Sequence, residues 1–279
     1  MEEKYGRLYE LMEEYTRDNV AVAFSGGVDS SLLLKLAVVC ARERKSRVIA
    51  VTAATELHPS RDEAIAGKVA LETGAEHRVL RVQELEQAGV AGNPVDRCYR
   101  CKRYLFERIR QEAEAMGASV VLEGTNADDL SEYRPGLKAI RELGIKSPLM
   151  EAGLTKEEVR RLAGEYGISV ARRPSSPCLA TRFPYGEELT YEKLRQVEKG
   201  ENYLKTLGLY NVRLRVHGRI VRIEADAEQM GRLVERREEI VGFLKELGYG
   251  YITLDLEGFR SGSMDETLSA EEKSMGNNR

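Results

Sequence analysis

Ser25-Gly26-Gly27-Val28-Asp29-Ser30-Ser31 is the stretch that decides the fold, because it joins two segments with different hydrophobic patterns. Before it, residues 20–24 (VAVAF) form a short apolar run, which is typical of a strand buried in a parallel sheet. After it, an apolar helix continues through residue 41, and Asp29 is a favourable residue for its first turn. Strand, glycine-rich turn and helix in this order predict an α/β fold.

The chain then repeats the alternation of strand and helix. Such alternation predicts a parallel sheet, whose ligands bind at the carboxyl ends of its strands. Residues 24–30 and 123–129 both lie at such ends. The last helix of the series begins with a capping box of Thr155 and Glu158. The expected strands are 47–52, 78–82 and 119–122, and the expected helices are 2–17, 60–73, 102–116 and 155–166.

A change of pattern after residues 171–186, a loop rich in Pro, Ser, Arg and Gly, indicates a second domain. We expect a helix at 190–206, then strands at 211–216 and 219–224 joined by a turn at His217-Gly218, a helix at 227–246 and a strand at 250–254. We therefore divide the chain into a parallel-sheet domain over 1–180 and a small α+β domain over 181–260, for substrate binding and oligomerisation. The polar tail 261–279 is expected to be disordered.

The glycine-rich turn has the features of a phosphate-binding loop. Its glycines allow the backbone N–H groups to turn inward, and the following helix N-terminus supplies partial positive charge. No Gly-Lys-Ser/Thr follows, which excludes a Walker A loop, and the glycine spacing excludes a dinucleotide fingerprint. A carboxylate beside phosphate is explained if Mg²⁺ neutralises it. The alternative is an ordinary strand-to-helix turn. The candidate ATP-binding residues here are Ser25, Gly26, Gly27, Asp29 and Ser30.

Bulk properties exclude other classes of protein. The net charge is −3 and the calculated pI about 5.9, whereas nucleic-acid-binding proteins are usually basic. No apolar run approaches the roughly 18 residues of a membrane span. The acidic, amphipathic start resembles neither a signal nor a transit peptide, so we expect the cytoplasm.

The four cysteines are expected to differ in role, because a disulfide framework is not expected in a reducing cytoplasm. Cys40 lies in an apolar helix and is predicted to be a core residue. Cys178 lies in a polar loop whose neighbours Arg172, Arg173 and Arg182 favour a reactive thiolate. Cys98 and Cys101 form a Cys-x-x-Cys pair, which alone fits zinc, a redox dithiol or a cluster.

The turn at 25–31 resembles the PP-loop of ATP pyrophosphatases, a superfamily that includes NAD and GMP synthetases and tRNA-thiolating enzymes. These enzymes cleave ATP between the α and β phosphates and leave AMP on a substrate oxygen. Residues 123–129 (EGTNADD) resemble the superfamily's second nucleotide-side segment. The resemblance implies that backbone groups of Thr52-Ala53 meet the adenine. It adds Ala53, Gly124 and Asp129 to the candidate nucleotide-binding residues.

Residues 175–186 (SSPCLATRFPYG), together with 122–130 (LEGTNADDL) and 133–137 (YRPGL), resemble the LarE family. These ATP-dependent sulfur transferases make the nickel-pincer nucleotide of lactate racemase. The resemblance implies adenylation of a carboxylate of pyridinium-3,5-biscarboxylic acid mononucleotide, followed by conversion to a thiocarboxylate. In the sacrificial version of the family, the cysteine that matches Cys178 attacks the acyl-adenylate and ends as dehydroalanine.

The sulfur source has three interpretations. The one we favour, which resembles some relatives of the family, has Cys98, Cys101 and Cys178 hold a [4Fe–4S] cluster with one open iron that binds sulfide. Sacrificial use of Cys178 with an incidental pair, and a persulfide or zinc site, are the alternatives. The partners expected are a small-molecule nucleotide, a sulfur donor such as sulfide and further copies of the chain.

Arg213 and Arg215 alternate on one expected strand, so they share a face and suit the phosphate of a nucleotide substrate, with Arg182. The alternative is a solvated edge strand. Glu201 and Glu224 flank this region and are candidate metal ligands.

Three other functions remain open at this point. A tRNA-thiolating enzyme needs a basic surface, which the acidic pI opposes. An amide-forming ligase such as an NAD synthetase has no use for Cys98, Cys101 and Cys178. A non-enzymatic nucleotide sensor would release no pyrophosphate.

Overall fold

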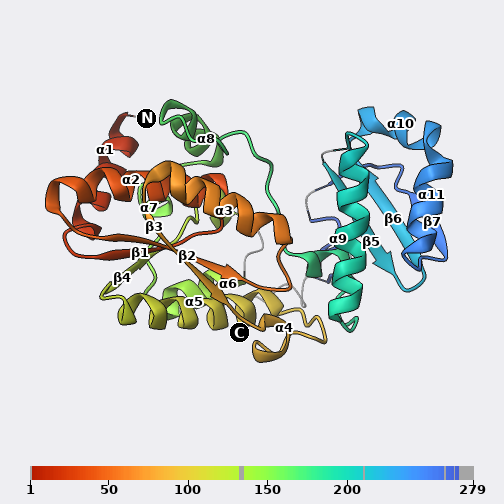
Figure 1. Cartoon of the computed structure of the whole chain (residues 1–279), viewed down its shortest axis with the longest axis horizontal. Coiled ribbons are helices and arrows are strands. Elements are labelled where there is room, and N and C mark those ends of the chain that lie inside the picture. Colours follow the sequence, from red (N-terminus) through yellow and green to blue (C-terminus); the bar gives the residue numbers. More distant parts are fainter. Residues whose placement is uncertain (1, 132–134, 210, 261, 267, 270–279) are drawn as a thin grey trace. The chain divides into compact units, whose positions relative to one another are not determined.

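The computed structural model describes residues 2–131, 135–209, 211–260, 262–266 and 268–269. They form two compact units (Figure 1). The first holds the described residues of Met1–Ala88 and Asp96–Ser176, and the second holds Gly89–Val95 and the described residues of Pro177–Lys273. Along these ranges, no helix has both the length and the apolar character needed to cross a bilayer.

A four-stranded parallel sheet forms the centre of the first unit. Its order is β3-β2-β1-β4, so the strand that precedes the glycine-rich turn lies inside the sheet. Val20 pairs with Val48 on one side and with Val120 on the other. The predicted parallel α/β fold is thus confirmed. The strands are β1 (Val20–Ala23), β2 (Val48–Ala54), β3 (Glu76–Arg81) and β4 (Val120–Leu122).

Helices cover both faces of this sheet, and the alternation along β1 shows why. Val20 and Val22 pack in one core with α1, α2, α3 and α8, whereas Ala21 packs in another with α5 and α6 (Figure 1). Successive residues of a strand point to opposite faces, so a wholly apolar strand needs a helix layer on each side. These helices are α1 (Glu2–Tyr15), α2 (Val28–Arg44), α3 (Ser60–Thr73), α5 (Arg97–Ala115), α6 (Gly136–Glu142) and α8 (Lys156–Glu165).

The capping box predicted for α8 is present. The backbone N–H of Glu158 donates to the hydroxyl of Thr155, and the carboxylate of Glu158 accepts from the backbone N–H of Thr155 at 2.8 Å. The short helices α4 (Glu84–Gln87), α6 and α7 (Pro148–Glu151) were not predicted, because elements of four to seven residues show too little periodicity.

The second unit is built on a three-stranded sheet of order β5-β6-β7. β5 (Val212–His217) and β6 (Ile220–Ala225) form the predicted hairpin, whose turn has Gly218 at φ 60°. β7 (Tyr251–Leu254) pairs with β6 in parallel. Helix α9 (Tyr191–Thr206) packs on β5. This mixed sheet with helices agrees with the predicted small α+β domain.

One predicted helix of the second unit is wrong. Residues 227–246 form a short 3-10 turn (Ala227–Gln229) and two helices, α10 (Met230–Glu235) and α11 (Arg237–Glu246). The break falls at Arg236, whose ψ of 16° leaves the helical range. The residues around it are mostly exposed and charged, so the hydrophobic pattern carries no sign of the interruption.

Two segments lie differently from the expected domain division. Gly89–Val95 belongs to the second unit, where the side chain of Asn93 donates to the carbonyl oxygen of Pro184 at 2.7 Å. Within the tail expected to be disordered, residues 262–266 and 268–269 include the buried side chains of Ser263 and Met264. The remaining tail residues, 261, 267 and 270–279, lie outside the described ranges, as do Tyr133 and Arg134 of the motif at 133–137.

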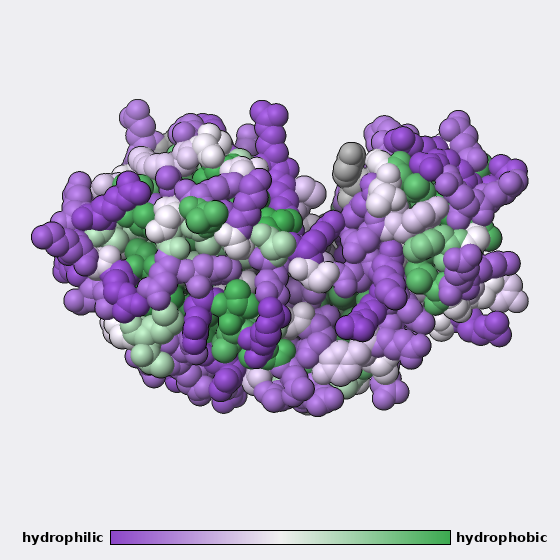
Figure 2. Space-filling view, in the orientation of Figure 1, coloured by the Kyte–Doolittle hydropathy of each residue, from purple (hydrophilic) through white to green (hydrophobic). Residues whose placement is uncertain are grey.

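The face shown in Figure 2 is mostly hydrophilic, and apolar side chains reach it in small patches. Exposed large apolar side chains include Leu71, Leu130 and Leu256. They lie far apart in the sequence, and scattered single apolar residues of this kind are normal on folded proteins.

Candidate functional site

The predicted phosphate loop connects β1 to α2, and its shape requires glycine. Gly26 has φ 68°, and a Cβ atom at this position would lie 2.9 Å from the backbone of Ala66 in α3. Gly27 is the N-cap of α2 and forms no side-chain cap. The first N–H groups of α2 are therefore available to an anion.

Serine hydroxyl groups hold the loop in this conformation. The Oγ atoms of Ser25 and Ser30 lie 3.2 Å apart, and Ser30 also donates to the carbonyl oxygen of Gly27 at 3.2 Å. The backbone N–H of Gly27 donates to Ser25 Oγ at 3.4 Å. The loop is thus preorganised by its own polar groups.

Asp29 brings the second predicted segment to the loop. Its Oδ1 accepts from the side-chain amide of Asn126 at 3.2 Å, and its Oδ2 pairs with the ammonium group of Lys156. Gly124 also packs tightly against the loop, because a Cβ atom on it would lie 2.9 Å from the backbone nitrogen of Ser30. The structure therefore places residues 123–129 beside the loop, as expected from their positions at strand ends.

The segment at 123–129 is itself fixed by buried hydrogen bonds. Glu123 is buried and accepts from the backbone and hydroxyl of Thr125 at 3.0 and 2.8 Å, and from the hydroxyl of Ser147. Asp129 accepts from the backbone N–H of Asn126 at 3.0 Å, which closes a capping box. The carboxylate of Asp129 thus shapes the segment that faces the loop.

Thr52 and Ala53 end the strand next to the loop. The hydroxyl of Thr52 donates to the carbonyl oxygen of Phe24 at 2.7 Å and lies 2.9 Å from Nε2 of His77. A hydroxyl has one hydrogen, so His77 donates through Nε2–H. Burial lowers the pKa of His77, and Glu63 opposes that shift. Sequence analysis did not single out His77.

The side chain of Arg173 contacts the phosphate loop. Its guanidinium donates to the carbonyl oxygen of Gly26 at 3.1 Å and pairs with the carboxylate of Asp62. The sequence instead grouped Arg173 with Cys178, its near neighbour in the chain. The contacts of Lys156 and Arg173 with the loop, like that of His77 with Thr52, were therefore missed by sequence reasoning.

The cysteines fall into the two units. Cys98 and Cys101 lie near the N-terminus of α5, three residues apart and so on one helix face, and both are half-buried. Cys178 lies in the second unit, immediately before the 3-10 turn Leu179–Arg182, and is also half-buried. Cys40 is a core residue as predicted, and burial raises its pKa. No group of three His, Cys, Asp or Glu side chains within the described ranges is arranged to hold a metal ion.

The predicted phosphate-binding arginines lie in buried ion pairs of the second unit. Arg182 donates to both carboxylate oxygens of Glu201 at 2.8 and 2.9 Å, and each side chain is 2% exposed. Burial alone would raise the pKa of Glu201, but Arg182, with Lys205 and Arg213, holds it below its ordinary value. Arg182 also donates to the backbone oxygen of Cys178 at 3.0 Å.

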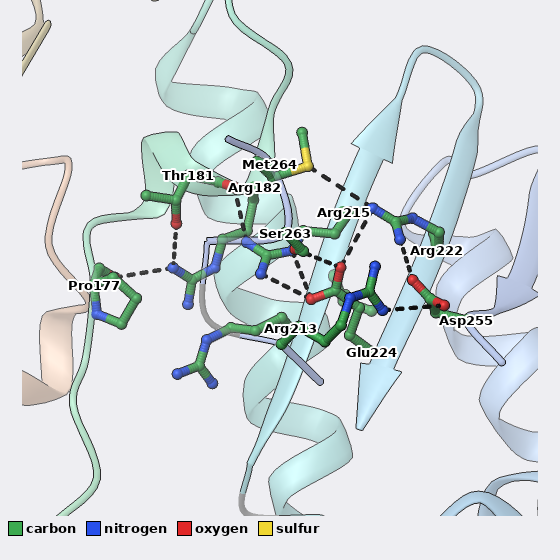
Figure 3. Close-up of polar contacts among 12 residues, drawn as sticks. Pro177, Thr181, Arg182, Arg213, Arg215, Arg222, Glu224, Asp255, Ser263 and Met264 are labelled. Atoms are coloured by element: carbon green, nitrogen blue, oxygen red, sulfur yellow. Dashed lines mark hydrogen bonds and ion pairs between the residues drawn. The ribbon is translucent and has the colours of Figure 1, made fainter. Parts of the chain in front are cut away.

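Glu224 is the second carboxylate of this region (Figure 3). It pairs with Arg215 at 2.8 Å and with Arg222 at 3.3 Å, and it accepts from the hydroxyl of Ser263 at 2.8 Å. The guanidinium of Arg213 lies 5.1 Å from the ring centre of Phe259. β5 is an edge strand, but Arg213 and Arg215 are 5% and 4% exposed, so it is not a solvated one. The candidate metal ligands Glu201 and Glu224 are engaged by arginine.

Comparisons with known proteins agree with this geometry. A family model of the PP-loop domain matches residues 1–147. The pyridinium-3,5-bisthiocarboxylic acid mononucleotide synthase of Lactiplantibacillus plantarum is 39% identical over 251 residues, which are 90% of this chain and 90% of that protein. The chain belongs to the LarE family. An uncharacterized protein of Synechocystis is 37% identical over 254 residues, which are 90% of this chain and 94% of that protein.

Membership of the LarE family confirms the resemblance found in the sequence and makes the protein an ATP-dependent sulfur transferase. More distant relatives match a smaller share of the chain. The tRNA-specific 2-thiouridylase MnmA of Rickettsia felis is 27% identical over 199 residues, covering 57% of this chain and 53% of that protein. The Lactiplantibacillus plantarum synthase matches 90% of this chain, so it accounts for more of the molecule.

Proposed function

We propose that the protein adenylates a carboxylate of pyridinium-3,5-biscarboxylic acid mononucleotide and converts it to a thiocarboxylate. The observation that carries this proposal is the 39% identity, over nine tenths of both chains, to a protein named as the bisthiocarboxylic acid mononucleotide synthase. The preorganised PP-loop supports the activation step, and the half-buried cysteines support the sulfur step.

The activation step uses the first unit. A carboxylate oxygen of the substrate forms a bond to the α-phosphorus of ATP, and the bond from that phosphorus to the bridging oxygen breaks. Pyrophosphate leaves with the electron pair and meets the N–H groups at the start of α2. Magnesium in such sites is usually held by one or two carboxylates and phosphate oxygens, which the single carboxylate of Asp29 fits. Asp29 would hold the ion, which neutralises phosphate charge when bound.

For the sulfur step we favour the three-cysteine version. Cys98 and Cys101 have the spacing and common face of two cluster ligands. Cys98 and Cys101 belong to the first unit and Cys178 to the second, and the proposal is that all three thiolates hold one cluster. A [4Fe–4S] cluster held by these thiolates would supply an open iron for sulfide. Sacrificial use of Cys178 remains the alternative.

Three arginines, Arg182, Arg213 and Arg215, form the arginine cluster, which is proposed to bind the phosphate of the pyridinium mononucleotide. Arg182, Arg213 and Arg215 share a buried region with two carboxylates, Glu201 and Glu224. Cations outnumber carboxylates among these five side chains, which favours a further anion. The arginines are held in place by their carboxylate partners, so little ordering is needed when phosphate arrives.

The compartment, the sulfur donor and the oligomeric state complete the proposal. A reducing cytoplasm would keep Cys98, Cys101 and Cys178 available as thiols. Sulfide is the proposed donor, and we expect a homo-oligomer.

One experiment tests activation and sulfur transfer together. The protein is purified without oxygen, reconstituted with iron and sulfide, and incubated with MgATP and the pyridinium biscarboxylate mononucleotide. We expect pyrophosphate release that depends on this substrate, a visible iron–sulfur band and an unchanged polypeptide mass. Pyrophosphate release only with tRNA would contradict the proposed substrate. A polypeptide lighter by one H₂S, with no cluster band, would establish the sacrificial alternative.

A further inference from the structure

The ion pair between Lys156 and Asp29 lies at the phosphate loop itself. Asp29 is in the first turn of α2, where the partial positive charge of the helix favours anions. Asn126 occupies Oδ1 of Asp29, and the ammonium group of Lys156 occupies Oδ2. The Lys156 and Asp29 side chains are 32% and 19% exposed, so solvent and ligands reach the pair.

The backbone of Lys156 is anchored, and its side chain ends in the ion pair with Asp29. Its N–H donates to the carboxylate of Asp128 at 2.9 Å, and it follows Thr155, the residue that caps α8. Lysine carries a compact charge on a flexible four-carbon stem, so the ammonium group can exchange partners without backbone movement.

Stability does not explain a lysine at this position, because partly exposed ion pairs contribute little. Asp29 is also the carboxylate that fits the magnesium ion of the activation step. An ammonium group and a divalent cation compete for the same carboxylate oxygens, since one carboxylate does not compensate both. A lysine displaced from Asp29 remains beside the loop where the polyphosphate binds.

We propose that Lys156 is a further catalytic residue, which neutralises Asp29 in the free enzyme and moves to the departing pyrophosphate when MgATP is bound. As the α-phosphorus gains its bond to the substrate carboxylate and loses its bond to the bridging oxygen, negative charge grows on the pyrophosphate. The ammonium group keeps its three protons and interacts with that charge. This inference rests on the adenylation step of the proposed function.

Lys156→Met tests the proposal, because it preserves side-chain length and removes the charge. We expect the nucleotide-free variant to bind Mn²⁺ about threefold to tenfold more tightly, since the competing ammonium group is gone. We expect substrate-dependent pyrophosphate release at saturating ATP to fall about 100-fold, the scale of one lost charge-stabilising group. Lys156→Arg should return Mn²⁺ affinity toward the wild type and recover part of the rate.

Lys193→Met is the matched control. Lys193 pairs with Glu187 at 3.0 Å, and the two side chains are 36% and 21% exposed, so the pair resembles that of Lys156 but does not involve the loop. Lys193→Met should change neither Mn²⁺ affinity nor pyrophosphate release. Calorimetric titration with Mn²⁺ and a pyrophosphate assay supply the two measurements, and the melting temperature shows that each variant is folded.

The two measurements separate a catalytic from a structural role. A folded Lys156→Met protein with wild-type pyrophosphate release, or with unchanged or weaker Mn²⁺ binding, overturns the proposal. If the wild type releases no pyrophosphate with the pyridinium substrate, the proposed substrate is wrong. The Mn²⁺ titration then decides the competition at Asp29 by itself, and an unchanged affinity overturns the role of Lys156.

Discussion

Gly124 lies so close to Ser30 that no side chain fits between Gly124 and the backbone of Ser30. A Cβ atom on Gly124 would lie 2.9 Å from the backbone nitrogen of Ser30 and 3.0 Å from Cβ of Asp29. Contacts of this length do not occur between unstrained atoms, so any larger residue must push β4 away from the phosphate loop. The glycine thereby sets the distance between the two nucleotide-side segments.

Gly124→Ala should therefore weaken ATP binding and destabilise the protein by about 1–3 kcal/mol, the usual cost of overpacking. Gly164→Ala is the control, because no atom lies within 4 Å of the Cβ position in α8 and alanine favours helix. That change should raise stability by a few tenths of a kcal/mol to about 1 kcal/mol. Urea unfolding and an ATP titration measure both effects. Equal behaviour of the two variants would contradict the close contact.

The contacts around Asp29 show which parts of the site the sequence could reveal. The loop follows from local pattern, since an apolar strand, two glycines and a helix are adjacent in the chain. Its partners are distant: Lys156 is 127 positions from Asp29, and Arg173 is 147 positions from Gly26. Neither lysine nor arginine carries a local signal for such pairing. Arg173 was instead assigned to Cys178, the cysteine closest to it in the chain.

In the fold, too, features set by the local sequence were predictable, whereas features set by distant contacts were not. Strands β1 and β2 were recognisable because burial on both faces makes them continuously apolar. The burial of Arg213 and Arg215 was not recognisable, because arginine on an edge strand is usually solvated. The transfer of Gly89–Val95 to the second unit depends on hydrogen bonds from Asn93 to residues about 90 positions later.

Because Glu201 and Arg182 form a buried ion pair, we expect acid to lower the free energy of unfolding of the protein. Glu201→Gln leaves the guanidinium of Arg182 without a charged partner and should cost roughly 3–5 kcal/mol at neutral pH. The pKa of Glu201 is lowered in the folded protein, so it contributes stability above its unfolded pKa of about 4.3. That contribution is lost as pH falls through the lower, folded pKa.

Denaturant unfolding from pH 7 down to pH 3 measures this prediction. The gap between the wild type and Glu201→Gln should be constant above about pH 5 and should shrink at lower pH. Glu246→Gln, at the exposed end of α11, should differ from the wild type by less than about 0.5 kcal/mol throughout. A gap that widens in acid would show that Glu201 is not stabilised as a carboxylate.

His77 predicts a second pH dependence, nearer neutrality. Burial lowers its pKa, so the folded protein binds fewer protons than the unfolded chain just below the ordinary histidine pKa of about 6.5. The neutral ring therefore contributes stability that is present above that pH and is lost as pH falls. His77→Gln keeps an N–H donor for Thr52 without titrating. Thermal melts between pH 7.5 and 5 should show a larger loss for the wild type, and parallel curves would contradict the assignment.

The four cysteines should differ in their reaction with iodoacetamide. In the folded, cluster-free protein, Cys98, Cys101 and Cys178 should be alkylated, because each is half-buried. Cys40 is 3% exposed and its pKa is raised by burial, so it should react at least about tenfold more slowly. Peptide mass spectrometry identifies the modified residues. Denaturation before alkylation is the control and should make all four react.

Reconstitution with iron and sulfide extends this measurement to the sulfur mechanism. If one cluster is held by three thiolates, Cys98, Cys101 and Cys178 should become protected together, and removing iron with a chelator should expose them together. Cys178→Ser should then also weaken the protection of Cys98 and Cys101, because the cluster loses a ligand. Protection of the pair with Cys178 still freely alkylated would rule out the shared cluster. Cys178 would then be available to act as the sacrificial sulfur donor.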